Sequence, residues 1–94
     1  MVEIRFSQSA WEDLDSITEY IAKDSIRYAK EFGNRVFDRI EQLHEFPYSG
    51  RVVPEFRNQN LRELILGKYR IVYRIYQEDL IIILRIVHGA KLIL

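Results

Sequence analysis

The chain begins with an alternation of apolar and polar residues at the spacing of a β-strand. The apolar members are Val2, Ile4 and Phe6. Because successive side chains of a strand point to opposite faces, this pattern predicts a strand over residues 2–7 with one face in a core.

Two helical patterns follow the first strand. Apolar residues recur every three or four positions, first at Trp11, Leu14, Ile17 and Ile21, then at Ala29, Phe32, Val36, Ile40 and Leu43. Ser9 and Glu12 have the spacing of a capping box, which predicts Ser9 as the N-cap of the first helix. The second helix should span residues 26–45, because Pro47 disfavours helical geometry at Phe46. A short break between the two patterns predicts an antiparallel helix hairpin, and Gly33 predicts that the helices cross closely.

The last third of the chain carries three strand patterns separated by turns of hairpin length. The turns lie at residues 67–68 and 77–79, and residues 48–60 are irregular, with Gly50 and Pro54 as breaks. The whole pattern predicts one α+β domain over residues 1–94. We expect an antiparallel sheet of about four strands in the order β-α-α-β-β-β, with the helix hairpin on one face.

The last strand is apolar on both faces. Leu80, Ile82, Leu84 and Ile86 alternate with a second set, and we expect this first set to pack on the helices. The second set should then lie on the face that the helices leave uncovered, where an exposed apolar strip usually marks an interface. Its apolar members are Ile81, Ile83 and Val87.

Composition removes several classes of function. The chain has no cysteine, which excludes disulfides, thiol catalysis and thiolate metal sites. We see no signal peptide, and the longest apolar run is too short to span a bilayer, so we expect a cytoplasmic protein with no membrane partner. Residues 1–47 hold 10 acidic and 6 basic residues, whereas residues 48–94 hold 4 acidic and 8 basic ones. The basic half therefore suits an anionic partner.

The candidate chemistry lies in that basic half. Arginines interrupt the strand patterns at Arg62, Arg70, Arg74 and Arg85. An arginine fork binds phosphate in a bidentate manner, but an arginine in a strand can equally form an ion pair, as Arg70 can with Glu63. We expect Arg85 to be paired and partly buried and Arg74 to be solvated. His88 titrates near neutral pH and is either an acid–base group or a strand-end hydrogen bonder. We find no metal-ligand pattern and expect no cofactor.

Several segments, in their order along the chain, resemble the RelE/ParE superfamily of toxins from type II toxin–antitoxin modules. They are Ala10 to Leu14 with Ile17, Tyr20 and Ile21; Leu43, Phe46-Pro47 and Gly50-Arg51; Leu61-Arg62-Glu63; Tyr69 to Tyr73; and Ile83 to Lys91. The likeness extends over essentially the whole chain. It is most specific where Tyr-Arg-Ile-Val-Tyr is followed by a strand that ends in His-Gly.

The resemblance implies a growth inhibitor that a cognate antitoxin neutralises. ParE-like members poison DNA gyrase without catalysis, and RelE-like members cleave mRNA on the ribosome. The ParE-like alternative is favoured, because two basic positions of the nucleases correspond here to Leu64 and Ala90. A third alternative is an inactive toxin-derived module that retains only antitoxin binding.

The resemblance also implies roles for particular residues. A nuclease would use Arg62, Arg70 and His88 for catalysis. For either activity, the expected target- or anion-binding residues are Arg62, Arg70, Arg85 and Lys91. The apolar strip of Ile81, Ile83 and Val87 is the expected antitoxin contact.

Overall fold

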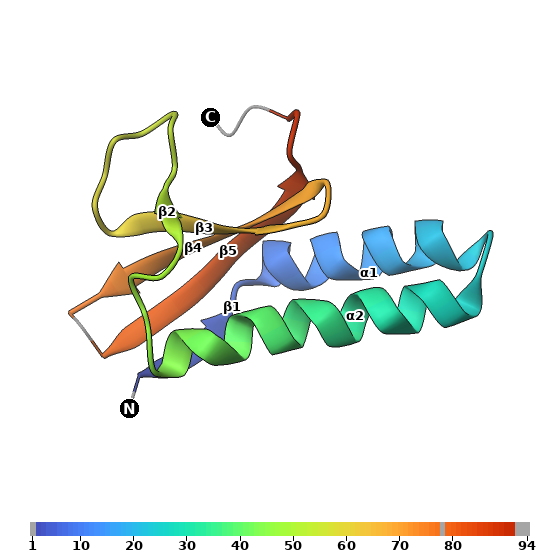
Figure 1. The fold of residues 1–94 in the computed structure, drawn as a ribbon, viewed down its shortest axis with the longest axis horizontal. Helices are drawn as coiled ribbons and strands as arrows, with labels where there is room; N and C mark the ends of the chain where they lie inside the picture. Colours follow the sequence, from blue (N-terminus) through green and yellow to red (C-terminus); the bar gives the residue numbers. More distant parts are fainter. Residues whose placement is uncertain (1, 78, 92–94) are drawn as a thin grey trace.

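The computed structural model describes residues 2–77 and 79–91. In these residues a helix hairpin packs on one face of a sheet (Figure 1). The elements in chain order are β1 (Glu3–Phe6), α1 (Gln8–Ala22), α2 (Ile26–Glu41), a short 3-10 helix η1 (Gln42–His44), β2 (Arg51–Val52), β3 (Leu61–Leu66), β4 (Tyr69–Tyr76) and β5 (Leu80–His88). None of the described helices is long and apolar enough to cross a membrane.

The predicted α+β class and element order are confirmed, but the sheet differs from the expected one. It has five strands in the order β1-β5-β4-β3-β2. β1 pairs with β5 in parallel, and the other neighbours are antiparallel. A parallel pair needs a long connection between its strands, and the helix hairpin and β2 to β4 all lie between β1 and β5 in the chain. The extra strand β2 is only two residues long and lies within the segment that the sequence predicted to be irregular.

The helix hairpin starts two residues earlier than predicted. Ser7 is the N-cap of α1, and its hydroxyl accepts a hydrogen bond from Ala10 N at 3.0 Å. The same hydroxyl donates to Leu84 O at 2.9 Å, which ties the start of the helix to β5. The predicted cap at Ser9 is therefore wrong, because a tertiary contact that no local pattern reveals favours Ser7.

Burial of the helices confirms one stripe and corrects the other. The stripe of α2 is buried as predicted: Ala29, Phe32, Val36, Ile40 and, in η1, Leu43. On α1 Ala10 takes the core position, and Trp11 is 44 % exposed instead of buried. A Cβ placed on Gly33 would have no neighbour within 4 Å, so the predicted close helix crossing is also wrong.

The prediction that β5 carries an exposed apolar strip on the face away from the helices is wrong. Ile81 and Ile83 have no exposed surface and belong to the core that faces the helices. A register shift between Val72 and Tyr73 of β4 leaves one extra residue in β5, since Tyr73 pairs with Ile83 but Val72 pairs with Arg85. Strict alternation along β5 therefore fails, and no single set of alternate residues forms one face. Val87 is also buried, at 7 % exposure.

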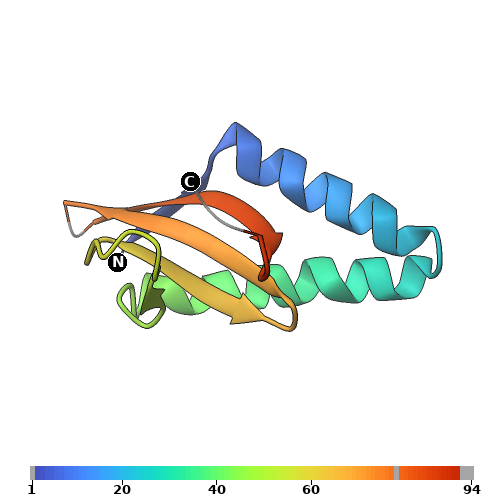
Figure 2. The ribbon, with the colours of Figure 1, turned by 90° about the horizontal axis from the view of Figure 1, so that it is seen from above.

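The two layers differ in extent. The end of the hairpin where α1 joins α2 extends past the sheet (Figures 1 and 2). On the other side of the sheet lie the loop between β2 and β3 and the end of the described chain (Figure 1). Arg62 and Arg70, two of the arginines singled out by the sequence, bond to these surface segments.

Candidate functional site: the arginines of the sheet

Arg70 is a buried ion-paired residue and not a free cation. It lies on β4, is 5 % exposed, and its Nε donates to Glu63 Oε1 at 2.6 Å. Its two terminal nitrogens donate to the carboxylate of Glu55 at 2.8 and 2.9 Å. These carboxylates, Glu55 first, raise the pKa of Arg70. The ion pair between Arg70 and Glu63 is confirmed, and anion binding by Arg70 would require both pairs to break.

The pairs around Arg70 connect three distant segments of the chain. Glu63 is 1 % exposed and also accepts from Arg51 Nε of β2. Glu55 lies in the loop between β2 and β3, and Arg70 also donates to Lys91 O after β5 at 3.3 Å. We call Arg51, Glu55, Glu63 and Arg70 the carboxylate clasp. Two cations and two carboxylates compensate one another here, which buried charges require.

Arg62 is held in a different way, by oxygen atoms that carry no formal charge. Its Nε donates to Gln59 O at 2.9 Å, and Nη1 donates to Gly50 O at 2.9 Å and to Tyr48 O at 3.2 Å. Its guanidinium carbon lies 5.0 Å from the centre of the Tyr48 ring. We call Arg62 and these three carbonyl groups the carbonyl clasp. It fixes the segment before β2, and no carboxylate of residues 2–77 or 79–91 forms an ion pair with the Arg62 charge.

Tyr73 supports the same segment from the core. Its hydroxyl donates to Pro47 O at 2.8 Å and accepts from Gly50 N at 3.0 Å. Burial raises the pKa of Tyr73, so the phenol remains neutral. A Cβ on Gly50 would lie 2.6 Å from Glu63 O, and the close approach of the backbone to β3 therefore requires glycine at this position.

Arg85 is paired and partly buried, as the sequence predicted. Its Nε and Nη2 donate to the two carboxylate oxygens of Asp13 on α1, at 2.7 and 3.0 Å. Asp13 also accepts from Ile86 N at 2.8 Å. Asp13 thus raises the pKa of Arg85 and joins the helix hairpin to β5 beyond the end of β1.

A small cleft brings the remaining candidates together at the end of β5. The cleft has a volume of about 240 Å³, and its lining includes Tyr69, Arg85, His88 and Lys91. His88 is exposed, and its Nδ1 accepts from Ala90 N at 3.1 Å, which leaves the proton of a neutral ring on Nε2. Its ring meets that of Tyr69 edge-on, with the centroids 5.9 Å apart. A catalytic role for His88 stays a prediction, as does anion binding by Arg62, Arg85 and Lys91.

Sequence reasoning missed the acidic partners of two arginines. Glu55 lies in a segment that the sequence predicted to be irregular, and Asp13 lies outside the apolar stripe predicted for the first helix; neither has a local signal that points to its arginine. Arg74 is exposed as predicted, with its guanidinium 5.3 Å from the Tyr76 ring centre. Among the described residues, no group of three or more acidic or histidine side chains is placed to hold a metal ion.

The comparisons with known proteins place the chain in the toxin class of type II toxin–antitoxin systems. The family model described as "ParE toxin of type II toxin-antitoxin system, parDE" matches residues 4–93, and the chain belongs to this family. The resemblance seen in the sequence, closer to ParE than to RelE, is therefore confirmed. No curated protein sequence matches the chain.

Solved structures share the fold over nearly the whole chain. A structure of the chromosomal ParDE system from P. aeruginosa has a TM-score of 0.75 at 22 % identity, covering 94 % of this chain and 96 % of that one. The RelBE2 toxin–antitoxin complex from Mycobacterium tuberculosis has a TM-score of 0.56 at 27 % identity, covering 93 % and 96 %. The solution structure of HP0894 from Helicobacter pylori has a TM-score of 0.59 at 16 % identity, covering 99 % and 100 %.

Proposed function

We propose that this ParE-family chain arrests bacterial growth by binding and poisoning DNA gyrase in the cytoplasm, without catalysing a reaction itself. We further propose that a cognate antitoxin neutralises it. Membership of the ParE toxin family supports both statements. The ParDE and RelBE2 structures that share its fold come from toxin–antitoxin systems, which supports an antitoxin partner.

The state of the arginines is the observation that favours gyrase poisoning over RNA cleavage. Cleavage through a ribose 2′-hydroxyl needs cations to stabilise the charge that builds on phosphorus. Two of the candidate cations, Arg70 and Arg85, are already bound by carboxylates, and Arg62 donates to backbone carbonyls. A binding surface needs no such free cations, and no proton has to move.

A supercoiling assay with purified gyrase tests the proposal directly. Added to gyrase and DNA, the chain should inhibit supercoiling, and cells that express it should filament while bulk mRNA stays intact. His88→Gln should change inhibition little, because no general acid or base is involved. Intact supercoiling together with ribosome-dependent mRNA cleavage would contradict the proposal.

The cleft beside His88 is the one observation that favours a RelE-like endonuclease instead. It places the imidazole of His88 beside the phenol of Tyr69 and near Arg85 and Lys91. If the chain is a nuclease, His88→Gln should reduce the cleavage rate about 10²-fold or more, as expected for a general acid or base. Equal cleavage by both variants would exclude this role.

Expression in cells also distinguishes an active toxin from an inactive binding module. We expect growth arrest from the chain alone and rescue by the co-expressed antitoxin. Unimpaired growth at verified soluble expression, combined with tight binding of that antitoxin, would identify an inactive module.

A further inference from the structure

Three aromatic rings form an exposed cluster where β1 passes into α1. The centroids of Phe6 and Trp11 are 4.3 Å apart with nearly parallel planes, and those of Phe6 and Phe37 are 5.7 Å apart. Trp11 and Phe37 each remain 44 % exposed. We call Phe6, Trp11 and Phe37 the aromatic cluster. Rings that pack on one another and still face water form a contiguous apolar surface of the kind that marks an interaction site.

An acidic cleft adjoins this cluster. It has a volume of about 760 Å³ and is lined by Asp38, Glu41, Gln42, His44, Glu45 and Phe46. Glu41 lies four residues after Phe37 on α2, so the two side chains are neighbours on one face of the helix. Phe46, at 59 % exposure, adds an apolar wall at the far end. We call this cleft the acidic cleft.

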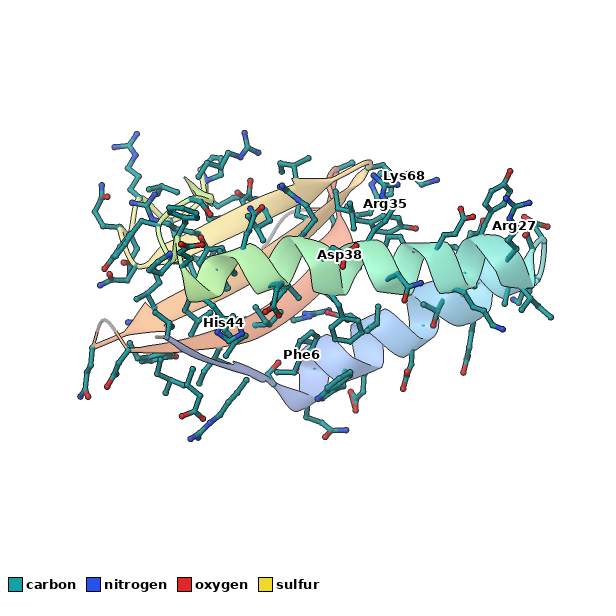
Figure 3. All side chains as sticks on the ribbon, turned by 60° about the horizontal axis from the view of Figure 1, so that its bottom comes forward. Phe6, Arg27, Arg35, Asp38, His44 and Lys68 are labelled. Carbon is teal, nitrogen blue, oxygen red and sulfur yellow. The ribbon has the colours of Figure 1, made fainter. Side chains whose placement is uncertain are left out.

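The open edge of β1 runs between the cluster and the cleft. Within the described part of the chain, β1 is an edge strand of the sheet and its one neighbouring strand is β5. Glu3 N and Ser7 N donate toward β5, and in a parallel pair the alternate residues, Ile4 and Phe6, direct their backbone groups to the other side. Val2 O also faces this side and accepts from His44 Nδ1 of the acidic cleft at 2.6 Å. Phe6 and His44 lie between the ribbons of α2 and β1 in Figure 3, with Asp38 projecting from α2.

The charge along this side is negative. Asp38, Glu41 and Glu45 are all exposed, and a carboxylate oxygen of Glu41 lies 3.8 Å from Nε2 of His44, which forms an ion pair with it only when the ring is protonated. The nearby cations are engaged elsewhere: Arg5 bonds to Glu3, and Arg39 donates to Ile65 O on β3. Arg35 and Lys68 lie on the opposite side of α2 (Figure 3).

We propose that the β1 edge, the aromatic cluster and the acidic cleft together bind an extended segment of a partner protein with alternating apolar and cationic side chains. The segment pairs with β1 as an added strand, its apolar side chains cover the aromatic cluster, and its cations meet the carboxylates of the cleft. β1 is four residues long, or about 13 Å at the rise of a strand, which suits a segment of four to six residues.

Charge selects this occupant over two others. An acidic segment would meet three exposed carboxylates of its own sign. A second copy of the chain, related by a two-fold axis, would bring the same acidic patch against itself. The inference is independent of gyrase poisoning, since it rests on a surface that contains none of Arg62, Arg70, Arg85, His88 and Lys91.

Trp11, the only tryptophan of the chain, reports binding through its fluorescence. The probe is a capped hexapeptide of alternating lysine and valine, and we expect a saturable spectral shift. Three matched peptides separate the contributions of charge, of apolar side chains and of backbone pairing to binding. A glutamate–valine peptide should bind at least about tenfold more weakly, a lysine–glycine peptide should not shift the spectrum, and N-methylation of alternate backbone nitrogens should weaken binding about tenfold.

Two double variants with the same change in net charge complete the test. Glu41→Lys with Glu45→Lys should weaken binding of the lysine–valine peptide at least about tenfold, whereas Asp15→Lys with Glu19→Lys, on the exposed face of α1, should leave it unchanged. Equal losses in the two variants, or equal binding of the acidic peptide, would overturn the proposal. So would a dimer in sedimentation that dissociates on Phe37→Ser, because the occupant would then be a second copy.

Discussion

Arg70 and Arg62 lie on neighbouring strands and looked alike in the sequence, yet the structure holds them in opposite ways. Arg70 is buried and bound by Glu63 and Glu55, whereas Arg62 is partly exposed and donates to three backbone carbonyls. The carboxylate clasp neutralises its charge, and the carbonyl clasp does not. The comparison shows that the partners of an arginine in a strand decide whether its charge is neutralised. Some of these partners lie outside the strands, such as Glu55, 15 residues from Arg70, and Tyr48, 14 residues from Arg62.

Removal of Arg70 should have the largest effect on stability. Arg70→Ala leaves Glu63 and Glu55 without their shared cation in a site that water hardly reaches. Breaking a buried ion pair in this way typically costs about 3–5 kcal/mol. We expect that loss in the free energy of unfolding measured with urea.

The excess negative charge that Arg70→Ala leaves in the carboxylate clasp can be tested separately from the lost packing. Adding Glu63→Gln to Arg70→Ala should recover part of the stability, because the buried charge is then removed. If the double variant is no more stable than the single one, charge compensation is not what holds the carboxylate clasp together.

The carbonyl clasp should depend more on the phenol beneath it than on its arginine. Tyr73→Phe removes the acceptor of Gly50 N and leaves this buried N–H unsatisfied, at a cost of about 1–3 kcal/mol. The raised pKa of Tyr73 adds a pH dependence. The contribution of the Tyr73 phenol to the free energy of unfolding is complete below the pKa of about 10 that tyrosine has in the unfolded chain. It is lost as the pH rises through the higher pKa that Tyr73 has in the folded chain.

The difference in unfolding free energy between wild type and Tyr73→Phe isolates this contribution from the other tyrosines. It should be constant near neutral pH and shrink in alkaline solution. A difference that does not change between pH 8 and pH 11 would show that Tyr73 does not titrate differently in the folded chain.

The sequence predicted the core better than it predicted the two clasps. Every residue of the predicted α2 stripe is buried, because helix periodicity reports directly on burial. Periodicity carries no information on Glu55 of an irregular loop, or on the tertiary bond from Ser7 to Leu84 that sets the start of α1. The register shift in β5 likewise depends on pairing with β4, and it moved Ile81 and Ile83 to the opposite face.

Arg62→Ala should cost less than either change above, about 1 kcal/mol. The carbonyl groups of Tyr48 and Gln59 belong to exposed residues and can bond to water once the guanidinium is gone. Urea unfolding of Arg62→Ala and Arg70→Ala under the same conditions compares the loss of unfolding free energy from the carbonyl clasp with that from the carboxylate clasp. A loss for Arg62→Ala as large as that for Arg70→Ala would mean that charge compensation does not distinguish them.

The smallest expected effect is a gain, at a position remote from both clasps. Gly33 lies inside α2, and a Cβ there would meet nothing within 4 Å, so Gly33→Ala adds helix propensity without a clash. We expect a stabilisation of about 0.5–1 kcal/mol, measured by the midpoint of thermal or urea unfolding. Since Gly33 shares no partner with Arg70, the two effects should add. In the Gly33→Ala background, Arg70→Ala should therefore stay folded over a wider range of urea concentration. Its loss of stability can then be compared more accurately with that of Arg62→Ala. A gain that disappears when Arg70 is replaced would instead show that the hairpin and the carboxylate clasp are coupled.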